Sequence, residues 1–199
     1  MSAKSLVIGS GEYRDVSVLL DAFHRGAAEA NLTLYFGCFH ADGRFLGTDA
    51  SENWHVNEFF DWCLPHFKAG DGWLYRPIAN SRKVAYFPNE TNPLFCVFDE
   101  LLKSEQFIAT SRGSGTLVFN IEKRTWLISQ YHLTFPIPND IATHVTKKIS
   151  IFEKSATEAT AAVAAAEAAR RLIEEWDLED KRPPAVPATS SKKKGGKKK

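Results

Sequence analysis

The stretch from Arg112 to Asp140 constrains the fold more than any other part of the chain. Its sequence, RGSGTLVFNIEKRTWLISQYHLTFPIPND, predicts strands at Gly115–Asn120 and Thr125–Phe135, joined by a polar turn at Ile121–Arg124. β-Branched and aromatic residues dominate both strands, and glycines and prolines mark their ends, as is typical of strand boundaries. The stretch therefore forms a hairpin against which the upstream residues can pack.

Length and charge limit the classes of protein that the chain can belong to. It has 199 residues and is 44% apolar, which suits one domain with extensions and a substantial core. The net charge is +1, but the last eight residues, KKKGGKKK, hold six of the 25 lysines and arginines. Because the remaining body is mildly acidic, we expect no general affinity of the folded part for polyanions.

The cysteines indicate a reducing compartment. Cys38, Cys63 and Cys96 stand far apart among apolar neighbours, and neither a disulfide framework nor metal-ligand spacing is evident. The sequence shows no signal peptide and no apolar run of about 18 residues, so we expect a cytoplasmic protein without membrane contact. No metal and no cofactor are expected, since zinc spacing, a Walker loop and a dinucleotide fingerprint are missing from the sequence.

The residues before the hairpin alternate between helical and strand patterns. Helices are expected from Val16, over Leu32–Phe39, and from about Glu52 to Lys68. Strands are expected at Arg44–Gly47, Trp73–Ile78, Lys83–Phe87, Leu94–Leu102 and from Phe107. The order helix, helix, strand, helix and four strands indicates an α+β fold, in which the helices cover one face of a bent antiparallel sheet.

The hairpin strands carry large apolar side chains on both faces. Simple alternation places Trp126 and Ile128 on one face and Leu127, Tyr131 and Leu133 on the other. Since large exposed apolar patches usually mark interfaces, we expect a homodimer formed through the outer face of the sheet.

Outside this domain the sequence changes character. Residues 154–179 predict a long Ala-rich helix, whose small side chains permit close approach of a second copy as a coiled coil. Residues 1–12 are expected to be flexible and residues 180–199 to be a disordered tail. The tail lysines suit either a nuclear-localisation or nucleic-acid-binding role or simple solubility, and nucleic acid is not the favoured partner.

The element order and three sequence stretches resemble the SnoaL-like group of the nuclear transport factor 2 (NTF2)-like superfamily. The stretches are FLGTDASENW, FDELL and RGSGTLVF…TWLISQYHLTFPIPND, and the resemblance covers Tyr13 to Asp140 within a domain assigned to residues 13–150. The closing pattern reads Trp126, Ile128, Gln130, His132 and Thr134. The resemblance implies a cone of three N-terminal helices on a curved sheet, with a pocket between them. This fold serves enzymes, transport factors and association domains, so it does not define an activity.

Two neighbouring carboxylates, Asp99 and Glu100, interrupt the apolar strand FCVFDELL. Adjacent strand residues point to opposite faces, so only one of the two can enter the implied pocket. A carboxylate in an apolar pocket has a raised pKa and can act as a general base. Alternatively, one of them pairs with Arg112 and the other faces solvent.

The steroid-isomerase branch of the superfamily uses an aspartate base with a tyrosine and a second carboxylic acid. By resemblance to this branch, Asp49 or Asp99 is a candidate base, and Tyr35 or Tyr131 a candidate oxyanion donor. The residues do not match that branch position by position, so the activity does not carry over. Asp49 is also explained as a helix cap.

The remaining candidates are ligand-binding residues. Trp54 and Trp73 would be pocket walls in the family, although large aromatic side chains are also common core residues. Arg112 is a candidate clamp for an anionic ligand group, unless it pairs with Asp99 or Glu100. His132 occupies the family-typical position, where a hydrogen-bonded core histidine is the alternative.

Two functions fit these patterns. The first is a dimeric association module or a module that binds a small hydrophobic or anionic ligand, without catalysis. The second is a small-molecule isomerase or cyclase with a pocket carboxylate as general base. The missing catalytic pattern favours the first.

Overall fold

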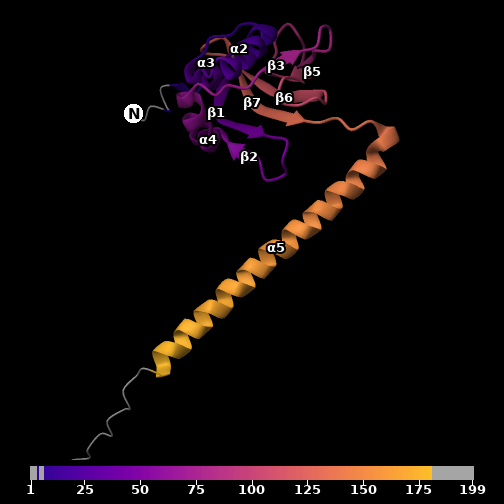
Figure 1. Ribbon diagram of the computed structural model, residues 1–199. Coiled ribbons are helices and arrows are strands. Elements are labelled where there is room, and N and C mark those ends of the chain that lie inside the picture. Colours follow the sequence, from indigo (N-terminus) through magenta and orange to yellow (C-terminus); the bar gives the residue numbers. More distant parts are fainter. Residues whose placement is uncertain (1–3, 5–6, 181–199) are drawn as a thin grey trace, which may run out of the picture. The chain divides into compact units, whose positions relative to one another are not determined.

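The computed structural model describes residue 4 and residues 7–180 (Figure 1). It divides into two compact units, Met1–Pro136 and Ile137–Lys199. The lysine-rich tail predicted at the C-terminal end lies outside the described residues from residue 181 onward. Among the described residues, no helix is both long and apolar enough to cross a membrane.

In the described part of the first unit, the helices α2, α3 and α4 pack on the sheet (Figure 1). Their bounds are Val16–Ala28 for α2, Leu32–Gly37 for α3 and Val56–Ala69 for α4. The predicted start of α2 at Val16 is confirmed, and the carboxylate of Asp15 caps the helix by accepting a hydrogen bond from the backbone N–H of Val18 at 3.0 Å.

Helix α4 begins later than the sequence pattern predicts. Residues Asn53–His55 form the short strand β2, which pairs with the first long strand of the sheet. His55 then caps the helix together with Glu58 in a reciprocal capping box. The predicted end is confirmed, since Gly70 follows the helix with a left-handed φ of 80°.

The strands form one curved, mixed sheet (Figure 1). The other strands are β1 (Phe39–Leu46), β3 (Tyr75–Pro77), β4 (Lys83–Phe87), β5 (Phe95–Ser104), β6 (Ser111–Asn120) and β7 (Thr125–Thr134). Their order is β2-β1-β7-β6-β5-β3, and β4 also pairs with β5. The pair β1–β7 is parallel and the other pairs are antiparallel, so the predicted α+β class of helices on a curved sheet is confirmed, with one parallel pair added.

The central hairpin contains a β-bulge that simple alternation misses. Thr116 pairs with Gln130 and the next residue, Leu117, pairs with Ile128, so Ser129 is an extra residue in β7. One extra residue reverses the faces of all later side chains. Consequently Trp126, Ile128, Tyr131 and Leu133 all belong to one core, and the prediction that placed Tyr131 and Leu133 on the face opposite Trp126 and Ile128 is wrong.

The core lies between the helices and one face of the sheet. Aromatic side chains dominate it: Phe23 stacks on Tyr35 at 4.6 Å between ring centroids, and Phe45 stacks on Phe59 at 4.0 Å. The largest fully buried side chains include Tyr35, Tyr131, Phe36, Phe39, Phe59, Leu19, Leu20, Leu102 and Glu100. Glu100 is the only ionisable carboxylate in this group, and its surroundings are described below.

The N-terminal segment, expected to be flexible, makes hydrogen bonds to the domain where the structure describes it. The backbone N–H of Gly9 donates to the carbonyl of Phe36 at 3.1 Å, and that of Gly11 donates to Gly37 at 3.0 Å. The carbonyl of Tyr13 accepts from the backbone N–H of Trp126 at 2.7 Å. These bonds fix residues 9–13 along α3 and β7.

The second unit contains the helix α5, Asn139–Asp180. It begins 15 residues before the predicted start at residue 154, because Pro136 and Pro138 interrupt the chain only before this point. Residues 139–150, which the sequence prediction included in the domain of residues 13–150, are therefore helical. The alanines at 156, 159, 162, 166 and 169 are exposed, and high intrinsic propensity accounts for the helix without packing.

Candidate functional site

A cavity of about 310 Å³ lies between α4, the sheet and three loops. Residues from β1, β2, α4, β3 and β7 line it, together with the loops around residues 47–52, 71–73 and 106–107. Aromatic side chains make up much of the wall, namely Phe45, Trp54, Phe59, Trp62, Trp73, Tyr75 and Phe107. The size and the apolar lining are typical of small-molecule sites.

The aromatic wall is held in place by ring contacts. Trp54 stacks on Trp62 with 5.3 Å between the ring centroids and an interplanar angle of 26°. Trp73 lies 5.8 Å from Trp62 and 4.9 Å from the buried ring of Phe67. Offset stacking and tilted contacts of this kind restrict the rings, so the three tryptophans present a largely preformed surface.

Polar side chains occupy a few positions in the same cavity. Glu52, Asp71 and His66 contribute ionisable groups to the lining, and the imidazole of His66 stands 4.9 Å from the ring of Trp62. Burial raises the pKa of Tyr75 above its ordinary value, and the negative charge of Glu52 adds to the rise. Tyr75 is therefore a neutral hydroxyl at the cavity wall.

Of the predicted pocket residues, Trp54 and Trp73 line this cavity. Tyr35, on α3, and Tyr131, on β7, both belong to the core between the helices and the sheet. Both are almost completely buried. Burial raises the pKa of both phenols well above the ordinary value, and the neighbouring groups Cys63 (for Tyr35) and Glu100 (for Tyr131) add smaller rises. Neither tyrosine is among the residues that line the cavity.

Asp99 and Arg112 lie on the outer face of the sheet. The Nε atom of Arg112 stands 3.0 Å from Oδ1 of Asp99, and both side chains are nearly half exposed. This is the ion pair that the sequence offers as an alternative to catalysis. Asp49 is exposed in the loop before β2, where its carboxylate accepts hydrogen bonds from the backbone N–H and hydroxyl of Ser51, which lower its pKa.

His132 also points away from the core. It lies between Tyr131 and Leu133, which both belong to the core, and it pairs across the sheet with Ser114. The bulge at Ser129 sets this orientation. None of Asp99, Asp49, Arg112 and His132 lines the cavity.

The two strand glycines, Gly113 and Gly115, make room for protein groups. A Cβ added to Gly113 would collide with the hydroxyl of Tyr131, and one added to Gly115 would collide with the carbonyl of Gln130. Space for a ligand is therefore not needed to explain them.

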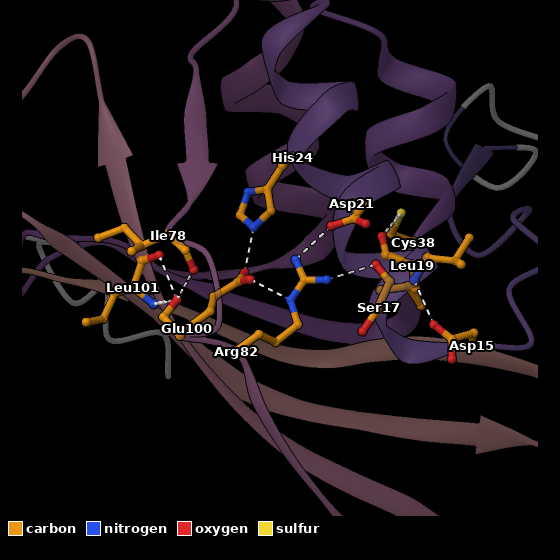
Figure 2. A network of polar contacts seen from close by, with 12 residues as sticks. Asp15, Ser17, Leu19, Asp21, His24, Cys38, Ile78, Arg82, Glu100 and Leu101 are labelled. Atoms are coloured by element: carbon orange, nitrogen blue, oxygen red, sulfur yellow. Dashed lines mark hydrogen bonds and ion pairs between the residues drawn. The ribbon is translucent and has the colours of Figure 1, made fainter.

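Glu100 is the carboxylate that enters the core, and it is fully buried. Its Oε1 lies 2.6 Å from Nε2 of His24, and its Oε2 accepts a hydrogen bond from Nε of Arg82 at 2.8 Å (Figure 2). The guanidinium of Arg82 also donates to Asp21 at 2.8 Å and to the carbonyl of Ser17 at 3.1 Å (Figure 2). These contacts connect α2, the residue before β4, and β5.

The electrostatics of this cluster favour an ionised Glu100. Burial acts to raise the pKa of the carboxyl, but the hydrogen bonds and positive charges of His24 and Arg82 outweigh it, so the pKa is lowered. With two donors already occupying its oxygens, Glu100 is a structural ion-pair partner rather than a general base for a ligand.

Sequence reasoning missed several of these residues. His24 and Arg82 reach Glu100 from 76 and 18 residues away, and no local pattern connects them. Trp62, which is not among the candidate residues named from the sequence, lines the cavity and is 43% exposed. A weak signal was present for Glu52 and Asp71, because each lies two residues before a tryptophan, but the same residues are ordinary loop residues.

No group of three or more possible metal ligands occurs among the described residues.

A cone of helices on a curved sheet, with a cavity between them, defines the NTF2-like and cystatin-like class of domain. The family model described as the SnoaL-like domain matches residues 16–138, and the chain belongs to this family. No curated protein matches the chain.

Solved structures with the same fold are only distantly similar in sequence. A cystatin-like fold protein from Caulobacter vibrioides is 12% identical with a TM-score of 0.50, covering 65% of this chain and 92% of that one. An NTF2-like protein of unknown function from Pseudomonas putida KT2440 is 8% identical with a TM-score of 0.49, covering 62% and 86%. A protein of the DUF3225 family from Pectobacterium atrosepticum is 16% identical with a TM-score of 0.46, covering 62% and 89%. The likeness to the Caulobacter vibrioides protein concerns the fold alone.

Proposed function

We propose that the domain is a noncatalytic module that binds a small ligand in the aromatic cavity. The observation that carries this proposal is the preformed wall of Trp54, Trp62 and Trp73 around a space of about 310 Å³. The carboxylates expected to act as bases, Asp49 and Asp99, are not among the lining residues, and the buried Glu100 is already engaged by His24 and Arg82.

A screen of small aromatic compounds, followed by tryptophan fluorescence, tests this proposal. Trp62→Leu removes a half-exposed wall residue and is expected to weaken binding of any hit by roughly tenfold, since an aromatic contact contributes about 1 kcal/mol or more. Phe152→Leu is the matched control, because Phe152 is an exposed aromatic residue of α5 that does not line the cavity. Equal weakening by both variants, or no hit at millimolar concentration, would reject the cavity as a binding site.

The outer face of the sheet supports dimerisation. Phe87, Phe95 and Val97 are each about 40% exposed, and the rings of Phe87 and Phe95 stack at 5.0 Å with an interplanar angle of 9°. A second copy would cover this patch. Sedimentation at micromolar concentration should show a dimer that Phe95→Glu dissociates, and a wild-type monomer would refute this part of the proposal.

The three cysteines support a reducing, cytoplasmic location. Cys38, Cys63 and Cys96 are all free and buried. Burial raises the pKa of the thiols of Cys38 and Cys96 to about 12. Both thiols are therefore protonated and unreactive as nucleophiles, as is typical of structural cysteines. Fractionation of cells that express a tagged full chain would test the location.

A catalytic alternative has one specific observation in its favour, namely that Glu52 and Tyr75 line the same cavity. A carboxylate base beside a neutral phenol is the arrangement that enolisation chemistry requires. Exchange of the α-protons of small ketones in D₂O, followed by NMR, should then exceed the buffer rate and be lost in Glu52→Gln. Equal rates for the two proteins and the buffer would exclude this alternative.

A further inference from the structure

We propose that the ligand of the aromatic cavity is a small organic cation of the alkylammonium class. This inference rests on the proposed ligand-binding function and adds the charge of the ligand to it. Three features of the cavity carry it, which are the sign of its charges, the nature of its wall and the position of one glycine.

The ionisable groups of the lining are acidic apart from one histidine. Glu52 and Asp71 contribute carboxylates, and His66 contributes an imidazole. Among the described lining residues, none is a lysine or an arginine. A negatively charged ligand would therefore meet two carboxylates without a compensating cation, whereas a positively charged ligand is attracted by both.

The aromatic wall of the cavity, like the charges of its lining residues, is suited to a cation. The ring of Trp62 lies 5.3 Å from that of Trp54 and 5.8 Å from that of Trp73, and all three indoles line the cavity. The face of an indole ring is the most favourable aromatic surface for a cation, and alkylammonium groups are recognised by clusters of such rings. A methylated ammonium group also fits an apolar wall, because it offers few hydrogen-bond donors that would need partners.

The absence of a side chain at Gly47 leaves space for the carboxylate of Glu52. A Cβ added to Gly47 would collide with this carboxylate, so the missing side chain leaves the space that the carboxylate occupies. One oxygen, Oε2, accepts a hydrogen bond from the backbone N–H of Asp49 at 3.2 Å, which fixes the side chain. Glu52 is thus a positioned negative charge at the cavity wall.

The structure also argues against the anionic ligand that the sequence allows. Arg112, the expected clamp, is paired with Asp99 on the outer face and does not line the cavity. The other arginine near the core, Arg82, is engaged by Glu100 and Asp21. Neither guanidinium is available to a ligand among the three tryptophans.

Three probes of similar size and different charge test the inference: phenyltrimethylammonium, benzyl alcohol and benzenesulfonate. Binding to the full-length protein is measured by calorimetry and tryptophan fluorescence at pH 8. We expect the cation to bind at least tenfold more tightly than the neutral probe, and the anion not to bind. The affinity for the cation should fall as salt is added, while that for the alcohol should not.

Charge-removing variants connect the binding to the cavity. Glu52→Gln keeps the shape and the acceptor oxygen, and we expect it to weaken binding of phenyltrimethylammonium on the order of tenfold while leaving benzyl alcohol unaffected. Asp71→Asn should act in the same direction. Glu122→Gln, in the exposed turn between β6 and β7, is the matched control and should change nothing.

The outcomes separate this inference from the function on which it rests. If benzyl alcohol binds as tightly as the cation, or if Glu52→Gln leaves the cation affinity unchanged, the cationic ligand is refuted and ligand binding stands. If none of the three probes binds at millimolar concentration, the cationic inference is also refuted. Loss of benzyl alcohol binding in Trp62→Leu, measured in parallel, supports the cavity as the site independently of ligand charge.

Discussion

Glu100→Gln is the substitution that tests the buried ion-pair cluster most directly. The change keeps the length of the side chain and one acceptor oxygen but removes the negative charge between His24 and Arg82. The new amide N–H₂ group would also face a hydrogen-bond donor, either Nε2 of His24 or Nε of Arg82, where the native carboxylate oxygen accepts a hydrogen bond. Both changes are destabilising. Arg82 loses its ionised partner, and two donor groups meet at the fully buried position 100.

The expected loss follows from the burial of the two partners. Removing one member of a buried ion pair costs about 3–5 kcal/mol when the other member remains buried. The side chain of Arg82 is 16% exposed and keeps its contact with Asp21, so water and a second carboxylate compensate it in part. We therefore expect Glu100→Gln to lower the free energy of unfolding by about 3 kcal/mol at pH 7.

The pH dependence has a defined sign. The pKa of Glu100 is lower in the folded protein than in the unfolded chain, so folding favours the ionised form. The stability that Glu100 contributes is present above the unfolded pKa and is lost as the pH falls through the folded pKa. The difference between wild type and Glu100→Gln should consequently shrink as the solution becomes more acidic than pH 4.5, the ordinary value for this carboxyl.

Urea unfolding of both proteins, followed by circular dichroism at pH 7 and at several acidic pH values, measures these quantities. Asp99→Asn is the matched control, because it changes the adjacent residue of the same strand on the opposite face. The Asp99–Arg112 pair is nearly half exposed, so its loss should destabilise by no more than about 1 kcal/mol. A loss below about 1 kcal/mol for Glu100→Gln, or equal losses for the two variants, would show that the buried cluster does not stabilise the fold as argued.

Two further substitutions test the packing of the hairpin. Trp126→Ala removes a side chain that is 3% exposed and contacts the rings of Phe119 and Tyr86, and should cost about 3–5 kcal/mol in urea unfolding, whereas a loss under 1 kcal/mol would contradict its burial. Gly113→Ala places a methyl group against the hydroxyl of Tyr131 and should cost about 1–3 kcal/mol; a neutral result would mean that the space is open.

The fold was largely predictable because its signals are local. The turn at residues 121–124, the caps at Asp15 and Gly70 and the helical periodicities each depend on a few neighbouring residues. The start of α4 was less predictable, since Asn53–His55 becomes a strand only by pairing with β1, which lies earlier in the chain. Tertiary contacts override local preference at such short elements.

The site was predictable only in part, for the same reason. Trp54 and Trp73 were anticipated as cavity walls, and alternation required that only one of Asp99 and Glu100 enter the core. Which of the two does so depends on the register of β5 against β6, which no local pattern shows. The partners of Glu100 come from α2 and from the residue before β4, so the cluster exists only in the folded chain.

The single extra residue at Ser129 also affects how this chain can be compared with its relatives. On the N-terminal side of the bulge, even-numbered residues of β7 such as Trp126 and Ile128 face the core, and on the C-terminal side odd-numbered residues such as Tyr131 do so. An ungapped alignment with a strand that lacks the bulge would equate core positions of one protein with outer-face positions of the other along half of β7. Placing a one-residue gap opposite Ser129 restores the correspondence, and any transfer of residue roles to His132 depends on that gap.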